Sequence, residues 1–283
     1  MNHCLPEWLR TVRAKRPALR ELRPALDRLG VNTVCESARC PNIGECWASR
    51  AATFMILGTA CTRNCRFCAV DHGYVQPPDP AEPQRIAAAA KEFGLRHVVV
   101  TSVTRDDLPD GGAAHFAATV TAIKSALDAS VEVLVPDFKG QRGPVATVLA
   151  AKPHIFGHNV ETVPRLYTTV RSRASYERSL AVLRIAKDIS PSQQTKSGLM
   201  AGLGERPEEV EDVLRDLKAA GVDMVTIGQY LRPSADQLPV AEYVSPEQFE
   251  EYERTARELG FRGVLCGPLV RSSYHAEQMA CEG

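Results

Sequence analysis

The stretch "TFMILGTACTRNCRFC", residues 53–68, joins a β-rich apolar run to three closely spaced cysteines. Its first part has the length and composition of a buried strand. Cys61, Cys65 and Cys68 follow at once with the spacing C-x3-C-x2-C. In parallel α/β barrels, the chemistry gathers on the loops that follow the strands. The stretch therefore indicates a reactive loop behind the first strand of such a fold.

Beyond this stretch the chain repeats the same alternation of β-rich run and helical pattern. Five further strand candidates begin at residues 97, 131, 154, 195 and 223. The clearest helix pattern is "RPEEVEDVLRDLKAAG", which opens with Pro207 and stops at Gly221. Repeated alternation predicts right-handed crossovers and one parallel sheet. We expect an α/β fold, an incomplete (β/α)6 TIM-type barrel over residues 53–262, with an N-terminal extension, 1–52, and a C-terminal tail, 263–283.

Composition narrows the classes of partner. The 34 basic and 34 acidic residues cancel, so bulk charge favours neither a nucleic acid nor a membrane surface. No apolar run approaches the ~20 residues of a membrane span. Glu7 and Arg10 interrupt any signal-peptide core near the start. We expect a cytoplasmic protein with no nucleic-acid partner and no membrane partner.

The nine cysteines favour metal binding over disulfides. Their number is odd, and six of them lie between residues 35 and 68. Thiolates at this density suit either zinc or an iron-sulfur cluster. A structural zinc site takes four ligands, whereas the triplet at residues 61–68 has no fourth Cys or His at a matching distance except His72. A four-iron cluster on three thiolates leaves one iron open to a small molecule.

A C-x3-C-x2-C motif after the first strand of a barrel resembles the radical S-adenosylmethionine (SAM) superfamily. The resemblance implies a [4Fe-4S] cluster on Cys61, Cys65 and Cys68, with the amino and carboxylate groups of SAM on the open iron. It also implies that an electron from the cluster cleaves SAM and yields a 5′-deoxyadenosyl radical. A zinc knuckle or purely structural thiols is the alternative.

A second triplet narrows the family. "CESARCPNIGECW" supplies Cys35, Cys40 and Cys46, and "RSSYHA" lies near the C-terminus. Together they resemble the auxiliary-cluster motifs of the lipoyl synthase family, whose fourth ligand is the serine before the tyrosine. That resemblance assigns a second [4Fe-4S] cluster to the three cysteines and Ser273. A serine oxygen is a poorer partner for iron than a thiolate, so this cluster should be readily dismantled.

The resemblance implies a reaction and its partners. The family replaces hydrogens at C6 and C8 of a protein-bound octanoyl-lysine with sulfur, using two SAM and sulfur from the auxiliary cluster. Such C–H bonds offer no proton to a positioned base, so a radical is required. The implied partners are octanoylated lipoyl carrier domains (glycine cleavage H protein and 2-oxoacid dehydrogenase acyltransferase subunits), an electron donor such as flavodoxin or ferredoxin, and an iron-sulfur carrier that rebuilds the cluster.

Three rim loops supply candidates for SAM binding. Gly111 and Gly112 resemble the Gly-Gly turn that holds the methionine amine in related enzymes; a turn before a helix is the alternative. Asn159 and Glu161 resemble the His-Asn-x-Asp segment of biotin synthase that contacts the ribose, or else cap a helix. Lys196 is a candidate for the methionine carboxylate, or else an ordinary solvated lysine.

Two other functions are compatible with two thiolate triplets. One is a radical SAM enzyme of the methylthiotransferase kind, which "RSSY" beside C-x4-C-x5-C disfavours. The other is an electron carrier with two clusters and no catalysis, which has no need of a barrel rim or of SAM. Two details also depart from the family pattern: "GTAC" stands where Gly-Asp precedes the first cysteine, and Gln237 lies where a histidine is usual.

Overall fold

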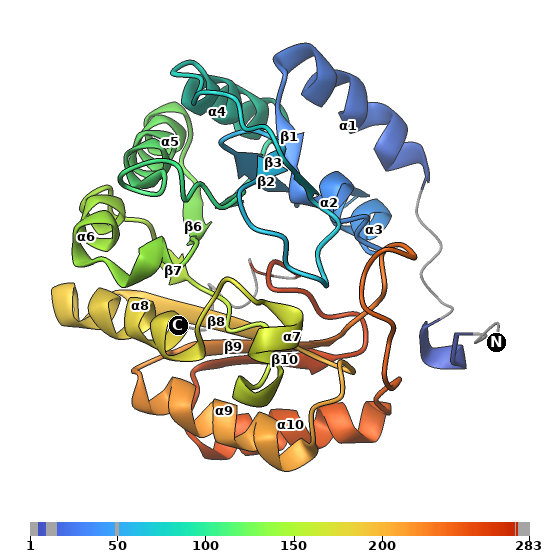
Figure 1. The fold of residues 1–283 in the computed structure, drawn as a ribbon. Coiled ribbons are helices and arrows are strands. Elements are labelled where there is room, and N and C mark those ends of the chain that lie inside the picture. Colours follow the sequence, from blue (N-terminus) through green and yellow to red (C-terminus); the bar gives the residue numbers. More distant parts are fainter. Residues whose placement is uncertain (1–4, 10–15, 49–50, 275, 277–283) are drawn as a thin grey trace.

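In the computed structural model, eight strands form one curved sheet in the middle of the molecule, and helices cover its outer face (Figure 1). The structure describes residues 5–9, 16–48, 51–274 and 276. The strand order is β1-β2-β5-β6-β7-β8-β9-β10. These strands are β1 (Asn32–Thr33), β2 (Thr53–Ile56), β5 (His97–Ser102), β6 (Ser130–Leu134), β7 (Ile155–Gly157), β8 (Gln194–Ala201), β9 (Met224–Gln229) and β10 (Gly263–Gly267).

The sheet confirms the partial TIM-type barrel. All neighbours from β2 to β10 pair in parallel, and β1 pairs with β2 in antiparallel fashion. The six predicted strands are present, and β1 and β10 are added at the two edges. The second addition was missed because β10 is followed by a polar segment, with no further helix pattern. Division of the chain at residues 52 and 262 stays a prediction, although both flanking parts contribute a strand; residues 1–4, 10–15 and 277–283 lie outside the described residues.

Ten α-helices and three 3-10 helices are found among the described residues. The α-helices are α1 (Arg16–Leu29), α2 (Val34–Ser37), α3 (Ile43–Ala48), α4 (Glu82–Glu92), α5 (Ala113–Ala126), α6 (Arg142–Ala150), α7 (Tyr167–Val170), α8 (Tyr176–Ile189), α9 (Pro207–Ala219) and α10 (Pro246–Glu258). The 3-10 helices are η1 (Glu7–Leu9), η2 (Phe138–Gly140) and η3 (Pro164–Leu166). None of the described helices combines the length and apolar character needed to cross a bilayer.

Helix α9 shows how the sequence pattern becomes packing. Its apolar face is fully buried in the core, and it consists of Val210, Val213, Leu214 and Leu217. Pro207 occupies the first turn, where a missing N–H costs nothing. Gly221 follows the last turn with φ +82°, a conformation that favours glycine. The predicted helix is therefore confirmed, together with its start and its stop.

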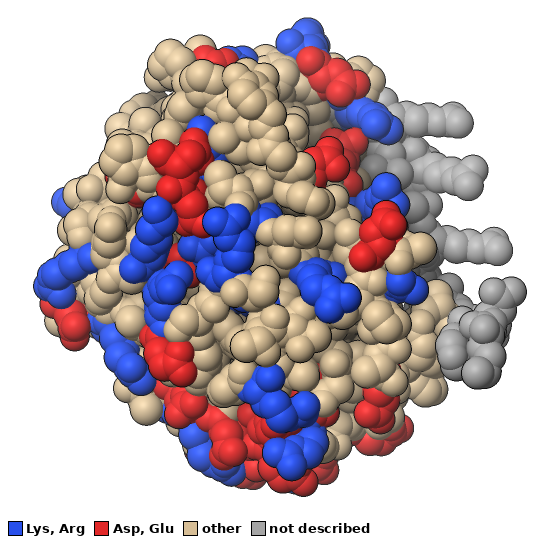
Figure 2. All heavy atoms as spheres, in the orientation of Figure 1, with Lys and Arg blue, Asp and Glu red and all other residues tan. Residues whose placement is uncertain are grey.

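The loops that follow the strands open onto one face, which Figures 1 and 2 view from the front. In Figure 1 the loop after β2, in cyan, crosses the middle of this face. Figure 2 shows Lys and Arg side chains around the middle of the same face, with Asp and Glu more frequent towards its edge. The parallel arrangement thus brings the predicted functional loops together at the mouth of the barrel.

Candidate active site

The first cysteine triplet lies on the loop between β2 and α4. Cys61 belongs to β3 (Ala60–Cys61), which pairs with β4 (Asp71–His72) in a short two-stranded sheet. Burial, together with the neighbouring Cys65 and Cys61, raises the pKa of Cys68 to about 12. Burial likewise raises the pKa of Cys65. The three thiols are therefore close neighbours, and a metal that binds them must displace their protons.

Two backbone amides point at the sulfur of Cys61. The N–H of Arg63 donates to Cys61 Sγ at 3.4 Å, and the N–H of Thr104 donates to the same atom at 3.3 Å. Thr104 belongs to the loop after β5, so a second rim loop contributes to this site. Hydrogen bonds of this kind stabilise a thiolate and tune the potential of a cluster bound to it.

A buried arginine locks the cysteine loop in place. The guanidinium of Arg63 donates to Asp106 at 2.7 and 2.9 Å and to Asp137 at 2.8 Å from each of two nitrogens. The Arg63 side chain is 5% exposed and that of Asp137 is fully buried. Burial alone would raise the pKa of Asp137, but the hydrogen bonds and charge of Arg63 outweigh burial and hold this pKa far below its usual range. One side chain thus ties together the loops after β2, β5 and β6.

Gly111 and Gly112 form a tight turn before α5, with φ values of +61° and +91°. A Cβ atom on Gly111 would lie 2.9 Å from Phe138 Cδ1, and one on Gly112 would lie 2.2 Å from Leu57 Cδ1. The N–H of Gly112 already donates to the carboxylate of Asp110 at 2.9 Å. Conformation and packing therefore account for both glycines, and their approach to SAM stays a prediction.

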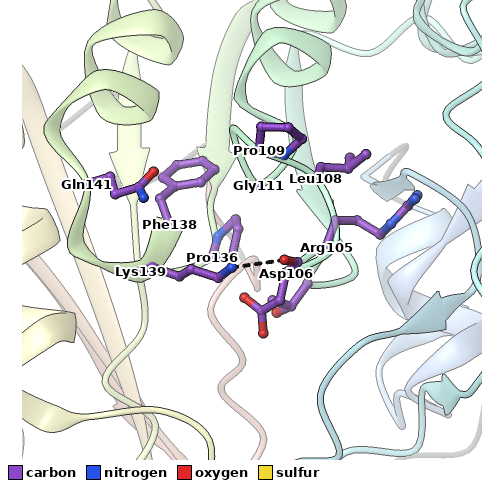
Figure 3. Close-up of a pocket in the computed structure, with 10 residues that line it drawn as sticks. Arg105, Asp106, Leu108, Pro109, Gly111, Pro136, Phe138, Lys139 and Gln141 are labelled. Carbon is purple, nitrogen blue, oxygen red and sulfur yellow. Dashed lines mark hydrogen bonds between the residues drawn. The ribbon is translucent and has the colours of Figure 1, made fainter.

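The pocket beside this turn is too small for a cofactor. Figure 3 shows the Phe138 ring facing Gly111 across it, with Asp106 and Lys139 at its lower edge. Lys139 Nζ donates to the carbonyl oxygen of Asp106 at 2.9 Å and closes that edge. The cavity volume of about 10 Å³ is close to the minimum that holds one water molecule. This pocket is therefore not the SAM site, and binding of SAM over the barrel mouth stays a prediction.

Asn159 and Glu161 lie side by side on the loop after β7. Asn159 Nδ2 donates to Glu161 Oε1 at 3.2 Å and to Ser272 Oγ at 3.0 Å. Burial raises the pKa of Glu161, whose backbone bridges to Leu199 on β8. The following helix η3 has Val163 as its N-cap, so the alternative reading of these residues as a helix cap is wrong. Their contact with the ribose of SAM stays a prediction.

A second buried arginine lies between this loop and the cysteines. Arg171 Nη1 donates to the carbonyl of Asn159 at 3.1 Å and to Tyr167 Oη at 3.3 Å. Its Nε has no hydrogen-bond partner among the described residues. Burial raises the pKa of Cys65, and the charge and hydrogen bond of Arg171 oppose that rise. The positive charge of Arg171 is therefore placed to compensate thiolates of the first triplet.

Lys196 requires a correction. It lies near the start of β8, and its Nζ is 3.0 Å from both carboxylate oxygens of Glu132 on β6. Both side chains are 2% exposed. Moving the ammonium group to a ligand would break this buried ion pair and leave the Glu132 carboxylate with only His97, whose Nε2 lies 3.5 Å from Oε2. Lys196 is therefore neither a ligand of the methionine carboxylate nor a solvated lysine; it belongs to the barrel interior.

The second cysteine triplet lies on two short helices outside the barrel. Cys35 is on α2, Cys46 is on α3, and Cys40 lies between them. Burial raises the pKa of Cys35 to about 11. Burial, with the neighbouring Cys35 and Cys40, raises the pKa of Cys46 to about 12. These three thiols are also neighbours, as the sequence predicts for one cluster.

The C-terminal "RSSY" segment approaches this second triplet. Asn42, between Cys40 and Cys46, donates from Nδ2 to the carbonyl of Leu269 at 2.6 Å, across 227 residues of sequence. Tyr274 Oη donates to Glu45 Oε1 at 3.0 Å. Ser273, partly buried, lies directly before this contact. Its place as fourth ligand stays a prediction that the course of the chain supports.

The donor chemistry of both triplets fits [4Fe-4S] clusters. None of the six cysteines is in a disulfide, so each triplet offers three soft sulfur ligands. Among the described residues, no three His, Cys, Asp or Glu side chains converge as ligands of one metal ion. Each thiolate of a four-iron cluster binds a different iron, so neighbouring but separate thiols are what such a cluster needs.

Several functional residues were missed from the sequence. Arg63 lies within the first cysteine motif and Tyr274 within "RSSY", so their position beside the proposed ligands could have marked them. Nothing in the local sequence of Arg171 marks it. Gln237, noted only as a departure from the family pattern, donates from Nε2 to the carbonyl of Cys68 at 3.2 Å and so holds the first triplet from the loop after β9.

Comparisons with known proteins agree with this geometry. The profile of the Radical SAM superfamily matches residues 55–229. The lipoyl synthase of Caldanaerobacter subterraneus subsp. tengcongensis is 58% identical over 272 residues, covering 96% of this chain and 95% of the relative. That of Rubrobacter xylanophilus is 55% identical over 278 residues, covering 98% of this chain and 87% of the relative.

Solved structures agree on the fold alone, because their sequence identities are low. Methylornithine synthase (PylB) superposes with a TM-score of 0.55 at 15% identity, over 75% of this chain and 70% of its own. HydG, a maturase of the [FeFe]-hydrogenase, gives 0.60 at 14% identity, over 95% and 75%. These two structures share the partial barrel with this chain, while the near full-length identities to the lipoyl synthases reach the auxiliary motif and the tail as well. The chain belongs to the lipoyl synthase family of the radical SAM superfamily.

Proposed function

We propose that this protein inserts sulfur at C6 and C8 of an octanoyl group held on a lysine of a lipoyl carrier domain. The observation that carries the proposal is the contact of the "RSSY" segment with the second cysteine triplet, through Asn42 and Tyr274. When bound, the clusters and two SAM supply the radical and both sulfur atoms. The family membership supports the same sulfurtransferase reaction.

The chain's own residues supply the two sites and their charge. Cys61, Cys65 and Cys68 hold the cluster that binds SAM, and Arg63 keeps their loop in position. The second cluster is assigned to residues 35, 40 and 46 with Ser273 as fourth ligand. Asn159 and Glu161 are assigned to the ribose, and the backbone at residues 111–112 to the methionine amine.

The partners follow from the substrate and the cofactors. The carriers we propose are the glycine cleavage H protein and the acyltransferase subunits of 2-oxoacid dehydrogenases. A flavodoxin or ferredoxin would deliver the electron, and an iron-sulfur carrier would restore the dismantled cluster. Six thiols at two sites, none of them in a disulfide, suit a reducing compartment, for which we propose the cytoplasm.

Anaerobic reconstitution tests the proposal. The protein should take up about eight irons per chain, from two four-iron clusters. With SAM, a strong reductant and an octanoyl-lysine peptide, it should form 5′-deoxyadenosine and dithiolated peptide. Formation of 5′-deoxyadenosine with an unmodified peptide would indicate a different radical SAM reaction. A zinc-loaded protein that does not bind SAM would contradict the proposal altogether.

A further inference from the structure

The segment after β10 runs across the mouth of the barrel. We call residues 268–274 the C-terminal strap. Its backbone passes so close to β9 that a Cβ atom on Gly228 would lie 2.0 Å from the carbonyl oxygen of Val270. Glycine at residue 228 is therefore required for this path. A ligand that binds over the carboxyl ends of β7 and β9 would therefore lie close to the strap.

Among the described residues, side-chain hydrogen bonds fasten the strap to two different parts of the molecule. Asn42 and Glu45 of the second cysteine motif hold Leu269 and Tyr274. Asn159, on the barrel loop after β7, holds the hydroxyl of Ser272 at 3.0 Å. Ser273 thus lies between a barrel anchor on one side and an anchor to the second motif on the other.

The hydrogen bond that anchors the strap to the barrel uses Asn159 Nδ2, the atom that would donate to a ribose hydroxyl. An amide nitrogen has two hydrogens. Those of Asn159 Nδ2 go to Glu161 Oε1 at 3.2 Å and to Ser272 Oγ at 3.0 Å. Asn159 is only 8% exposed, so little water is at hand to replace either partner. A ribose hydroxyl that accepts from this nitrogen must displace Glu161 or Ser272.

We infer that Ser272 is a positioning residue that couples SAM binding at Asn159 to the hold on Ser273. With Asn159 unoccupied, the Ser272 hydroxyl keeps the strap down and Ser273 in place. When SAM takes the Asn159 amide, the strap loses its barrel anchor and Ser273 is freed to leave the second cluster. This coupling rests on the proposed function, and it links each SAM bound to the release of the weakest iron ligand.

Ser272→Ala tests the coupling on the reconstituted enzyme without reductant, so that no turnover occurs. SAM no longer has to displace a hydroxyl, so its Kd should fall about fivefold, the worth of one neutral hydrogen bond. By reciprocity, the equilibrium affinity of the second site for its labile iron, measured by competition with a chelator in the absence of SAM, should fall about fivefold, and added SAM should then change it little. A residue with only a structural role would weaken SAM binding instead of tightening it.

Two control variants accompany Ser272→Ala. Ser125→Ala removes an exposed hydroxyl on α5, which donates only to its own helix at Thr121, and should leave both values unchanged. Ser272→Thr keeps the hydroxyl and should behave as wild type. If Ser272→Ala fails to fold, hydrogen exchange of residues 268–274 in the wild type should still accelerate on adding SAM.

Unchanged or weaker SAM binding in Ser272→Ala, or a strap whose exchange ignores SAM, would overturn the inference. Assays of 5′-deoxyadenosine and dithiolated peptide on the wild type are run in parallel. If these succeed while the strap shows no coupling, the inference alone fails. If the wild type makes neither product, the proposed function fails first.

Discussion

The two cysteine triplets offer the same thiol donors, but different contacts hold them in place. The first lies on a loop that a buried arginine holds: Arg63 donates two hydrogen bonds to the carboxylate of Asp106 and two to that of Asp137. Cys61 additionally receives two backbone N–H groups. Because these contacts are buried and charged, the first site is built to keep its geometry through many turnovers.

The second triplet lies outside the barrel and meets the C-terminal strap. Asn42, between α2 and α3, donates to the backbone of the strap at Leu269, and Tyr274 of the strap donates to Glu45 on α3. The charge of Glu45 adds to burial and to the other thiols in raising the pKa of Cys46, which disfavours a thiolate there. A durable site beside one that is easily opened is the arrangement expected when one cluster is a catalyst and the other a sulfur source.

We expect the largest difference between the two triplets when one cysteine ligand is removed from each. Cys65→Ala and Cys40→Ala should each retain about four of about eight irons. Cys65→Ala should abolish SAM cleavage, whereas Cys40→Ala should still form 5′-deoxyadenosine but no dithiolated peptide. Iron analysis and mass spectrometry of both products measure this. Loss of SAM cleavage in Cys40→Ala would show that the sites are not separable.

Arg63→Met removes the side chain that holds the loop of the first cysteine triplet in place. Removing one partner of a buried ion pair costs about 3–5 kcal/mol, because the other charges stay buried. Arg66→Met, in the same loop but exposed, is the matched control and should change the free energy of unfolding by less than about 0.5 kcal/mol. Anaerobic denaturant unfolding measures both. Equal effects of the two variants would contradict the assigned role of Arg63.

The same ion pair should make the first site sensitive to acid. The pKa of Asp137 is lowered in the folded protein from about 3.9 in the unfolded chain, so folded protein binds fewer protons there. Stability from this pair is full above about pH 4 and is lost as pH falls through the folded pKa. Asp137→Asn should cost on the order of 1–3 kcal/mol at pH 7, and less as pH falls below about 4. Unfolding of both proteins at matched pH measures the difference, and a pH-independent difference would contradict the assignment.

Ser273→Ala probes the weaker site. Loss of the proposed oxygen ligand should speed iron release from the second cluster by about tenfold, the lower range for losing a supporting contact of a metal site. SAM cleavage should persist, because the first triplet keeps all its ligands. Chelator kinetics and 5′-deoxyadenosine assays are the measurements. Loss of SAM cleavage with the second cluster intact would count against Ser273 as its ligand.

Local sequence patterns predicted most of the sheet, helix α9 and both cysteine triplets. The six strands and α9 followed from apolar runs and stop signals, because parallel strands buried on both faces read as continuous apolar stretches. The two triplets followed from spacing alone. Strand β10 was missed since "GVLCG" at residues 263–267 has no helix pattern behind it, and its pairing with β9 is a tertiary contact.

Long-range partners were beyond the sequence. The contacts of Arg63 with Asp106 and Asp137 span loops of three different strands, and no local rule pairs them. The prediction for Lys196 was wrong for the same reason, because its partner Glu132 is distant in the sequence. A lysine near a Gly-rich loop is usually solvated, and only the fold shows that β8 places it opposite Glu132 on β6, one strand removed.

The corrected place of Lys196 gives the smallest expected effect. If its charge serves only Glu132, the double variant Lys196→Met with Glu132→Gln should remain within about 2 kcal/mol of the wild type in unfolding free energy, since a buried pair replaced as a unit is often close to neutral. SAM affinity should stay within about twofold, because a site outside the mouth contributes no more than a distant substitution. Isothermal titration without reductant measures the affinity. A tenfold weaker Kd for SAM would restore Lys196 to the cofactor site and erase the distinction between barrel interior and rim.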